Sequence, residues 1–408
     1  MLAWFTAPLL AWGALTTFAG AQTSSPSRPA VEREKLDAAL RNAGKIGVLI
    51  ASHGDIDDYE KELESYIKVS FQRNPGIPLP DWSRGILTGP AYSLSVNLVR
   101  NQYKIIGPTR YRESSEAQRQ AIDRALAARG IDAKTYVGFN FTTPYIDEAL
   151  EEMIADGVDT VIVFNKGAQF SYASSGENME DALKYLNKKY PKNLRVIGYR
   201  QYSDDARFRQ LMATVLQNDV EKFFPDVSAN RVCLLVATHG LPVWLIEKGD
   251  PAITQMKEAV ADIQKRLPQY RIYHGFLNDD FFPGAKWVKP TARELAEQME
   301  KDRCEHILMD GRVSFTSHHR ATLYDLNTEV RGFFETPPGP RETARAAYWR
   351  RPNVVLAPNF DGDEGYANLI ADLSMEAVAG VGPVVTLQET GKRPLPVGSV
   401  GKPGVKPF

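Results

Sequence analysis

The sequence predicts an α/β protein with two similar Rossmann-like lobes, each a parallel sheet flanked by helices, and a cleft between them. Two observations lead to this fold class. Residues 45–54 (KIGVLIASHG) and residues 231–240 (RVCLLVATHG) share one form, an apolar strand that ends in His-Gly. An all-apolar strand is typical of a parallel sheet that helices cover on both faces. Strands and helices then alternate in the same order in both halves of the chain, as in repeated βαβ units.

The first half continues with a second strand, a helix and a third strand. Residues 136–139 read as the second strand, and residues 160–164 (TVIVF) as the third. We expect Thr143 to cap the helix between them and Pro144 to occupy its first turn. Gly157 lies just past the expected end of this helix, where a left-handed residue often terminates the last turn.

The second half repeats this order. Residues 273–276 correspond to the second strand, and residues 306–309 (HILM) to the third. The helix between them starts near Thr291, and Thr291 with Glu294 fits a capping box. Each half therefore supplies one complete strand–helix–strand unit, which predicts two related lobes rather than a single large sheet.

We place the N-terminal lobe at residues 45–225 and the C-terminal lobe at residues 230–380. Residues 388–408 are rich in Pro, Gly and Lys and have little to bury, so we expect a disordered tail. Ligands of open α/β sheets bind beyond the carboxyl ends of the strands. His53 and His239 both stand at such ends, which makes them candidates for a site in the cleft.

The first 21 residues predict a secretory signal peptide. An apolar run from Leu2 to Phe18 is followed by Ala19-Gly20-Ala21 and a polar stretch, which fits cleavage after Ala21. We therefore expect an exported, periplasmic protein. The alternative is an uncleaved leader that anchors the protein in the membrane, because about 18 apolar residues nearly span a bilayer. No later segment is long and apolar enough to cross a membrane.

Composition narrows the function. The chain of 408 residues carries 49 Lys and Arg against 50 Asp and Glu, so there is no excess of positive charge to attract nucleic acid. Its two cysteines, Cys233 and Cys304, are too few for a disulfide framework, a four-thiolate zinc site or a cysteine-held iron–sulfur cluster. We expect no tightly bound cofactor.

The two His-Gly histidines differ in their surroundings. His239 precedes Gly240-Leu241-Pro242, a turn that stops the strand and directs the side chain into the cleft. The alternative is a strand-terminal histidine that bonds a backbone carbonyl. His53 is a secondary candidate, because the acidic residues after it serve equally to favour the start of the next helix. It is either part of the site or a relic of the repeat.

Two further histidines, His318 and His319, follow the last strand of the second repeat, again on its carboxyl side. Neighbouring side chains point in different directions, so we expect one of the two to face a given ligand. Imidazole suits late first-row divalent ions, and its pKa near 6.5 suits proton transfer. His274 and His306 lie in or beside apolar runs, and we expect both to be structural.

Further motifs occur in a fixed order along residues 45–380. They are residues 105–108 (IIGP), 169–171 (QFS), 234–242 (LLVATHGLP) with 247–251 (EKGDP), 286–291 (KWVKPT), 314–324 (SFTSHHRATLY) and 358–360 (PNF). In this order the segments resemble the ferrochelatase family of tetrapyrrole metal chelatases. The resemblance implies the fold of two similar lobes, with a porphyrin cleft between them. It also implies that the protein inserts a divalent metal, Fe²⁺ or else Co²⁺ or Ni²⁺, into a porphyrin or a related tetrapyrrole, with release of two protons.

The resemblance also assigns residues. His239 matches the family's catalytic histidine, which binds the metal or takes a pyrrole proton. The family's loop glutamate falls at Ala321, and the aspartate before the loop histidine is His318. Cobalt chelatases of this superfamily use a loop histidine as a metal ligand, so His319 or His318 compensates for the lost carboxylate in this interpretation. The catalytic candidates are thus His239 and His319, and the candidate metal ligands are His239, His319 and His318.

The macrocycle needs a cleft wall and polar anchors for its acidic side chains. Tyr103, Arg110 and Tyr172 are candidates for tetrapyrrole binding because they lie near the motif segments. Two other functions remain open at this point. The departure at Ala321 fits an exported protein that binds a tetrapyrrole, heme or a metal without catalysis. A two-lobed small-molecule receptor would have the same architecture, but it would not need a histidine at the end of each first strand.

Overall fold

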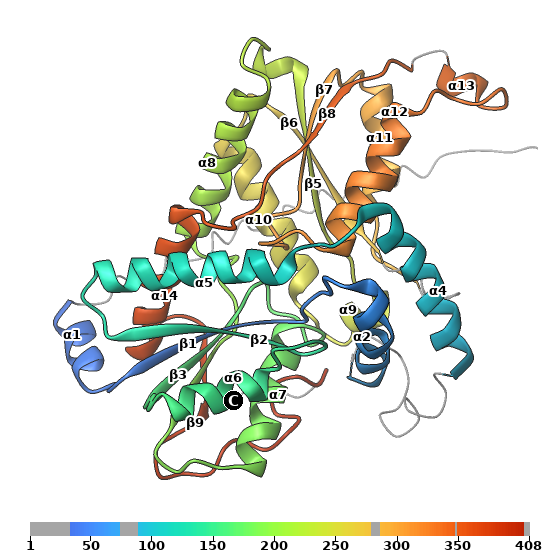
Figure 1. Ribbon diagram of the computed structural model, residues 1–408. Helices are drawn as coiled ribbons and strands as arrows, with labels where there is room; N and C mark the ends of the chain where they lie inside the picture. Colours follow the sequence, from blue (N-terminus) through green and yellow to red (C-terminus); the bar gives the residue numbers. More distant parts are fainter. Residues whose placement is uncertain (1–32, 74–88, 279–285, 347–348, 404–408) are drawn as a thin grey trace, which may run out of the picture.

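The computed structural model describes residues 33–73, 89–278, 286–346 and 349–403, and it confirms the α/β class with two parallel sheets (Figure 1). The expected signal peptide lies outside the described residues. The first sheet has the strand order β2-β1-β3-β4-β9, and the second has the order β6-β5-β7-β8. The first-sheet strands, in sheet order, are Ala133–Phe139, Ile46–Ser52, Thr160–Asn165, Arg195–Tyr199 and Val384–Gln388. The second-sheet strands are Arg271–Leu277, Val232–His239, His306–Asp310 and Asn353–Leu356.

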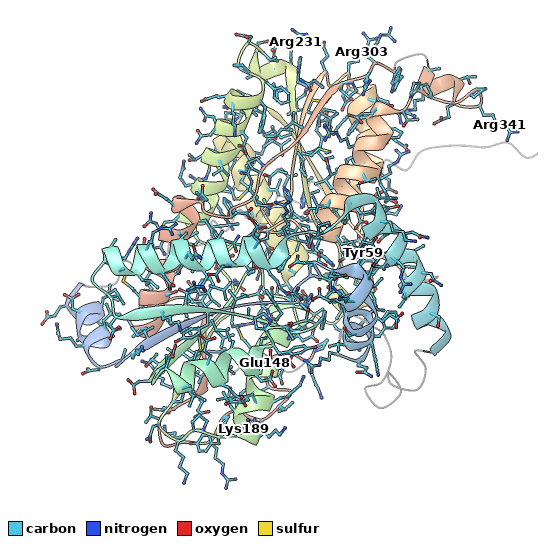
Figure 2. All side chains as sticks on the ribbon, viewed as in Figure 1. Tyr59, Glu148, Lys189, Arg231, Arg303 and Arg341 are labelled. Carbon is cyan, nitrogen blue, oxygen red and sulfur yellow. A yellow bond between two sulfur atoms is a disulfide. The ribbon has the colours of Figure 1, made fainter. Side chains whose placement is uncertain are left out.

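The two His-Gly strands, β1 and β5, lie inside their sheets and pair in parallel with a neighbour on each side. All seven residues of β1 are buried, and so are the first seven of the eight in β5. Burial on both faces explains why neither strand alternates apolar and polar residues. In Figure 2, Arg231 and Arg303, which precede β5 and β7, mark the far end of the second sheet, so the carboxyl ends of these strands face the other lobe.

Helices cover both faces of each sheet. One face of the first sheet packs on α6 and α7, and the other packs on α5 and α14. The second sheet packs on α8 and α10 on one face and on α11 and the π-helical segment η2 on the other. These helices span Tyr111–Ala128 (α5), Ile146–Ala155 (α6), Ser175–Lys188 (α7), Ala206–Phe223 (α8), Ala252–Arg266 (α10), Ala292–Lys301 (α11), Ala321–Val330 (η2) and Glu364–Val378 (α14). The other helical segments are Arg33–Arg41 (α1), Tyr59–Arg73 (α2), Gly89–Ile106 (α4), Ala229–Arg231 (η1), Val243–Glu247 (α9), Arg331–Glu335 (α12) and Thr343–Ala346 (α13). None of the described helices is long and apolar enough to span a bilayer.

Two helices cross between the lobes, which corrects the lobe limits that we expected. Helix α8 lies within residues 45–225, the expected N-terminal lobe, yet it contacts strand β7 of the second sheet and helix α10, which covers that sheet. Helix α14 lies within residues 230–380, the expected C-terminal lobe, yet it contacts strands β3 and β4 of the first sheet and helix α5, which covers that sheet (Figure 1). Phe208 and Met212 of α8 belong to the same buried cluster as Ile370 and Leu373 of α14. Periodicity shows that a helix has an apolar face but not which sheet the face covers.

The end of the chain is a second correction. Strand β9 adds an antiparallel edge to the first sheet beside β4. Beyond it, the chain packs on α7, where the carboxylate of Glu180 accepts hydrogen bonds from the backbone N–H of Val400 at 2.6 Å and of Gly401 at 3.0 Å. Val400 is fully buried. The expectation of a disordered tail is therefore wrong as far as Pro403, and residues 404–408 lie outside the described chain.

The two expected helix starts differ in outcome. The capping box at Thr291 and Glu294 is confirmed. Helix α6 begins at Ile146 instead of directly after Thr143. The carbonyl of Pro144 accepts a hydrogen bond from the N–H of Phe139, at 2.8 Å. Pro144 is therefore bound to the end of β2 and does not belong to the first turn of the helix.

Cys233 and Cys304 form a disulfide, a pairing that the sequence did not predict. Cys233 lies in β5 and Cys304 in the turn before β7, so the bond joins the starts of two neighbouring strands. Both residues are buried, and 71 positions separate them. The bond therefore closes a long loop that contains α10, β6 and α11.

Candidate active site

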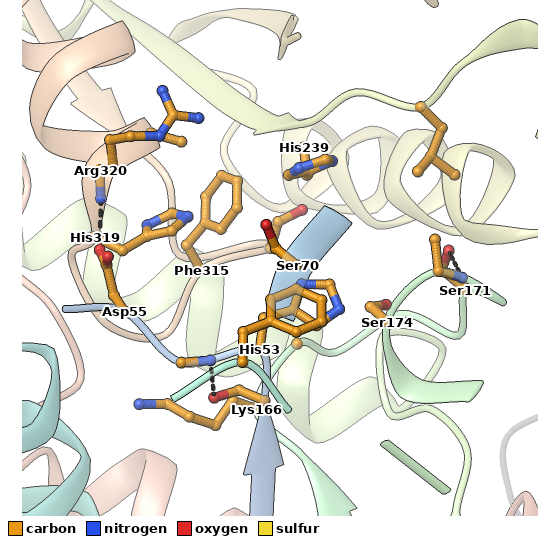
Figure 3. Close-up of a pocket in the computed structure, with 18 of the residues that line it drawn as sticks. His53, Asp55, Ser70, Lys166, Ser171, Ser174, His239, Phe315, His319 and Arg320 are labelled. Atoms are coloured by element: carbon orange, nitrogen blue, oxygen red, sulfur yellow. Dashed lines mark hydrogen bonds between the residues drawn. The ribbon is translucent and has the colours of Figure 1, made fainter. Parts of the chain in front are cut away.

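A cavity of about 320 Å³ lies between the lobes, at the carboxyl ends of β1, β3, β5 and β7. This is within the size range of small-molecule sites. Both lobes contribute chemically active side chains to its wall (Figure 3). Those of the N-terminal lobe are His53, Asp55, Tyr103, Lys166 and Gln169, and those of the C-terminal lobe are His239, Phe315, Ser317, His319 and Arg320. The cleft expected from the repeat is confirmed.

His239 and His319 lie on the same wall, with Phe315 between them (Figure 3). The ring centroids of His239 and Phe315 are 5.9 Å apart, and those of Phe315 and His319 are 4.5 Å apart. Residue His239 is the last of β5, so the parallel sheet fixes its backbone, while His319 follows the loop after β7. Two imidazoles that are distant in sequence thus meet at one apolar surface.

The imidazole of His319 is held neutral. Burial lowers its pKa well below the usual value for histidine, and the charges of Arg320 and His239 lower it further. The backbone N–H of His319 donates to the hydroxyl of Thr322 at 2.9 Å, which fixes the loop at the start of η2. A neutral imidazole keeps one nitrogen lone pair free, and metal ligation requires that lone pair.

His318 is not part of the cavity lining. Its Nδ1 lies 3.3 Å from the hydroxyl of Thr322, and burial lowers its pKa as well. The structure therefore brings His239 and His319 together and leaves His318 outside the lining, so one of the two neighbouring histidines faces the cavity, and His318, a candidate metal ligand, does not. Among the residues that the structure describes, no three His, Cys, Asp or Glu side chains are grouped to hold a metal ion.

His53 lines the opposite wall, from the N-terminal lobe (Figure 3). Its ring stacks on Phe141 with centroids 4.6 Å apart. Its Nε2 lies 3.5 Å from Oε2 of Glu177, a buried residue near the start of α7. Burial raises the pKa of the Glu177 carboxyl, although His53 counteracts part of the rise. His53 is thus at the site and has a carboxylate partner that the sequence gave no reason to suspect.

Asp55 is a cavity residue that the sequence analysis left out. Its carboxylate accepts hydrogen bonds from the Tyr103 hydroxyl, from the N–H of Ile56 at 2.8 Å and from the N–H of Arg320 at 2.9 Å. Burial raises its pKa, and these hydrogen bonds oppose the rise. Tyr103 lines the cavity as expected, but its hydroxyl is engaged with Asp55. The available signal was the position of Asp55, two residues beyond His53.

Lys166 is the second residue that the sequence analysis missed. It follows β3, and its ammonium donates to the hydroxyls of Ser115 and Ser317, each at 2.7 Å. It also lies 4.2 Å from the ring centroid of Tyr111. Burial lowers the pKa of Lys166 to about 7, and Asp361 raises it in part. A polar side chain at the end of a buried strand was the only signal for it.

The other two expected tetrapyrrole anchors are not in the cavity lining. Arg110 is exposed, between α4 and α5. Tyr172 packs on Phe170, and its N–H donates to Asp250 at 2.9 Å. Proximity to a motif in the sequence did not indicate which way these side chains point, so the structure supports neither assignment.

Ala321 is buried and lines the cavity at the first residue of η2. The loop before it, residues 314–320, contains no acidic residue. The carboxylate of Asp55 reaches this loop from the other lobe. It accepts a hydrogen bond from the backbone N–H of Arg320, the residue before Ala321. The wall that holds His239 and His319 therefore presents imidazole, aromatic and hydroxyl groups, and its nearby carboxylate belongs to the other lobe.

Comparison with known proteins agrees with these features. The family model described as Ferrochelatase matches residues 45–353. Ferrochelatase-2, chloroplastic, of Arabidopsis thaliana is 24% identical over 372 residues, which cover 89% of this chain and 69% of that protein. The ferrochelatase of Aquifex aeolicus is 26% identical over 289 residues, which cover 70% of this chain and 88% of that protein. Among solved structures, SirB from Bacillus subtilis with Fe³⁺ matches with 12% identity and a TM-score of 0.47, over 82% of this chain and 96% of that one.

Proposed function

The chain belongs to the ferrochelatase family, since the family model covers residues 45–353, and from that premise we propose that it inserts a divalent metal ion into a tetrapyrrole. The reaction replaces two pyrrole protons with one dication. The observation that carries the proposal is the pairing of His239 with His319 on one wall of a cavity between the lobes. Phe315 supplies a flat apolar surface between them, as a macrocycle requires.

The metal is a substrate here, and the residues present suit loose binding. Two imidazoles hold a divalent ion less tightly than a closed four-ligand site, which allows the ion to leave for the macrocycle. Affinity of nitrogen ligands rises from Fe²⁺ through Co²⁺ to Ni²⁺. Because no acidic residue lies in residues 314–321, we expect Co²⁺ and Ni²⁺ to bind more tightly than Fe²⁺.

Insertion also needs access to the nitrogen lone pairs of a flat ring, which binding energy supplies by bending the macrocycle. His239 stands at the end of a rigid buried strand, so it approaches the ring from a fixed direction. His239 then contacts the incoming metal or takes a pyrrole proton, and His319 contacts the metal.

An anaerobic absorbance assay tests the proposal. Purified protein is mixed with protoporphyrin or sirohydrochlorin and with Fe²⁺, Co²⁺ or Ni²⁺, and the shift from free base to metallated spectrum is followed. We expect His239→Ala to abolish insertion. The matched control is His306→Asn, at the opposite end of the second sheet, which should retain the wild-type rate. Unchanged activity in His239→Ala would remove this histidine from the mechanism.

One observation favours a second function, an exported protein that binds a tetrapyrrole, heme or a metal without catalysis. The family's loop glutamate is replaced by the buried Ala321, and no three-residue metal group is present among the described residues. Such a protein would bind porphyrin tightly, yet its spectrum would stay that of the free base with every metal. The same assay therefore separates the two functions.

We also propose that the protein works outside the cytoplasm. The disulfide between Cys233 and Cys304 supports an oxidising compartment, where such bonds persist. This agrees with the leader expected at residues 1–21. Fractionation of producing cells, with thiol labelling before and after reduction, should find the protein outside the cytoplasm with both cysteines oxidised. A cytoplasmic protein with free thiols would contradict the proposal.

A further inference from the structure

The N-terminal wall of the cavity contains a buried carboxylate–imidazole pair. Nε2 of His53 and Oε2 of Glu177 are 3.5 Å apart. The His53 side chain is 31% exposed toward the cavity, whereas that of Glu177 is 4% exposed, so Glu177 lies behind His53. Among the described residues, neither carboxylate oxygen of Glu177 has a hydrogen-bond donor. A buried carboxylate without donors is rare in folded proteins and calls for an explanation.

The surrounding charges do not explain Glu177. Asp181, one turn later on α7, accepts from Asn140 at 2.7 Å and pairs with Lys184 at 2.5 Å and with Arg73 at 3.4 Å. Both of these cations pair with Asp181, whereas His53 is the ion-pair partner of Glu177. Asp181 itself disfavours a negative charge on Glu177.

We propose that His53 and Glu177 form the proton-accepting pair of the insertion reaction, with His53 as the catalytic base and Glu177 as its positioning residue. The inference rests on the proposed function. His53 takes the proton as a pyrrole N–H bond breaks and a nitrogen–metal bond forms, and it passes the proton to water at its exposed edge. The second pyrrole proton leaves by the same route, so two protons leave as one dication enters.

Electrostatics favours this wall for the proton. A proton that His53 accepts places its positive charge 3.5 Å from the Glu177 carboxylate, and an opposite charge at this distance stabilises it. The arrangement therefore separates two tasks that one face of the macrocycle would otherwise share, with metal delivery at His239 and His319 and proton removal at His53.

The test compares Glu177→Gln with Glu180→Gln. Glu180 is a buried glutamate on the same helix, but it binds the backbone of residues 398–401 instead of His53. We expect Glu177→Gln to lower kcat for Co²⁺ insertion into protoporphyrin roughly 100-fold, the lower end of what a positioned general base contributes. The dissociation constants of Co²⁺ and of porphyrin, measured separately by absorbance and by fluorescence quenching, should stay within about twofold. His53→Gln should lose at least as much.

The pH dependence distinguishes positioning from a structural role. In Glu177→Gln the acid limb of the kcat profile should move to lower pH, because a neutral amide no longer stabilises a proton held by the pair. Glu180→Gln should keep the wild-type profile even if it unfolds more easily. A wild-type profile and kcat in Glu177→Gln would overturn the inference while leaving insertion intact. A wild-type protein that inserts no metal would instead overturn the proposed function and this inference together.

Discussion

The carboxylate of Asp55 accepts a hydrogen bond from the backbone N–H of Arg320 at 2.9 Å, across 265 positions of the chain. Asp55 follows β1 of the first sheet, and Arg320 ends the loop that carries His319. The contact therefore fixes the position of His319 relative to the N-terminal wall. Gln118 strengthens the same junction, because its amide donates to the carbonyl of Thr316 at 2.8 Å.

Asp55→Asn tests this junction. An amide at this position offers one acceptor oxygen, whereas three donors converge on the two oxygens of Asp55. We expect the variant to lose about 1–3 kcal/mol of unfolding free energy, because a buried donor is left without an acceptor. Urea unfolding followed by circular dichroism measures the loss. The matched control is Asp58→Asn three positions later, where the side-chain oxygen accepts from backbone N–H groups at the start of α2. Asparagine caps a helix as well as aspartate does, so this variant should change stability by less than about 0.5 kcal/mol.

Lys166→Met should change how stability depends on pH. The folded-state pKa of Lys166 is about 7, below its ordinary value of 10.5, so between these values the unfolded chain binds more protons than the folded one. Lys166 therefore makes stability rise as pH increases from about 7 to 10.5. We expect the methionine variant to lose this slope. Urea unfolding at several pH values in this window, compared with Lys192→Met on the surface, gives the difference, and parallel curves for wild type and Lys166→Met would contradict the prediction.

Ala321→Glu restores the carboxylate that the family carries in this loop. The side chain would enter the cavity close to His319, and it would add a negatively charged oxygen ligand to an imidazole wall. We expect the dissociation constant for Co²⁺ to fall roughly tenfold, the lower end of the change in affinity that single supporting groups cause at metal sites. Visible absorbance of Co²⁺ measures it. Ala321→Gln has the same size without the charge, and equal gains in both variants would show that charge is not the cause.

The sequence predicted the parts of the fold that are local or repeated. β1 and β5 are apolar throughout and end in His-Gly, so their place in parallel sheets and the position of His53 and His239 at the cavity followed directly. The exchange of α8 and α14 between sheets did not follow, because an apolar helix face fits either sheet. The disulfide depends on β5 and β7 being neighbours, which two cysteines alone do not indicate.

Site residues divide in the same way. His239 and His319 come from motifs, and the structure places both at the cavity. Asp55 and Lys166 stand just beyond buried strands, a weak local signal, but their roles depend, like that of Glu177, on partners from distant segments. Arg110 and Tyr172 show the reverse, since nearness to a motif placed them on the correct segment but not at the cavity.

The crossing of α8 and α14 makes the halves of the molecule interdependent. Each sheet takes one of its covering helices from the sequence half of the other, and Phe208, Leu234 and Ile370 lie in one continuous core. A chain cut between residues 225 and 230 would give two fragments, each with a sheet face that lacks one of its two covering helices and with a surplus amphipathic helix. A hydrophobic core shared by both lobes, instead of a flexible linker, therefore sets the width of the cleft. The two walls of the cavity are held at a fixed spacing before any ligand binds.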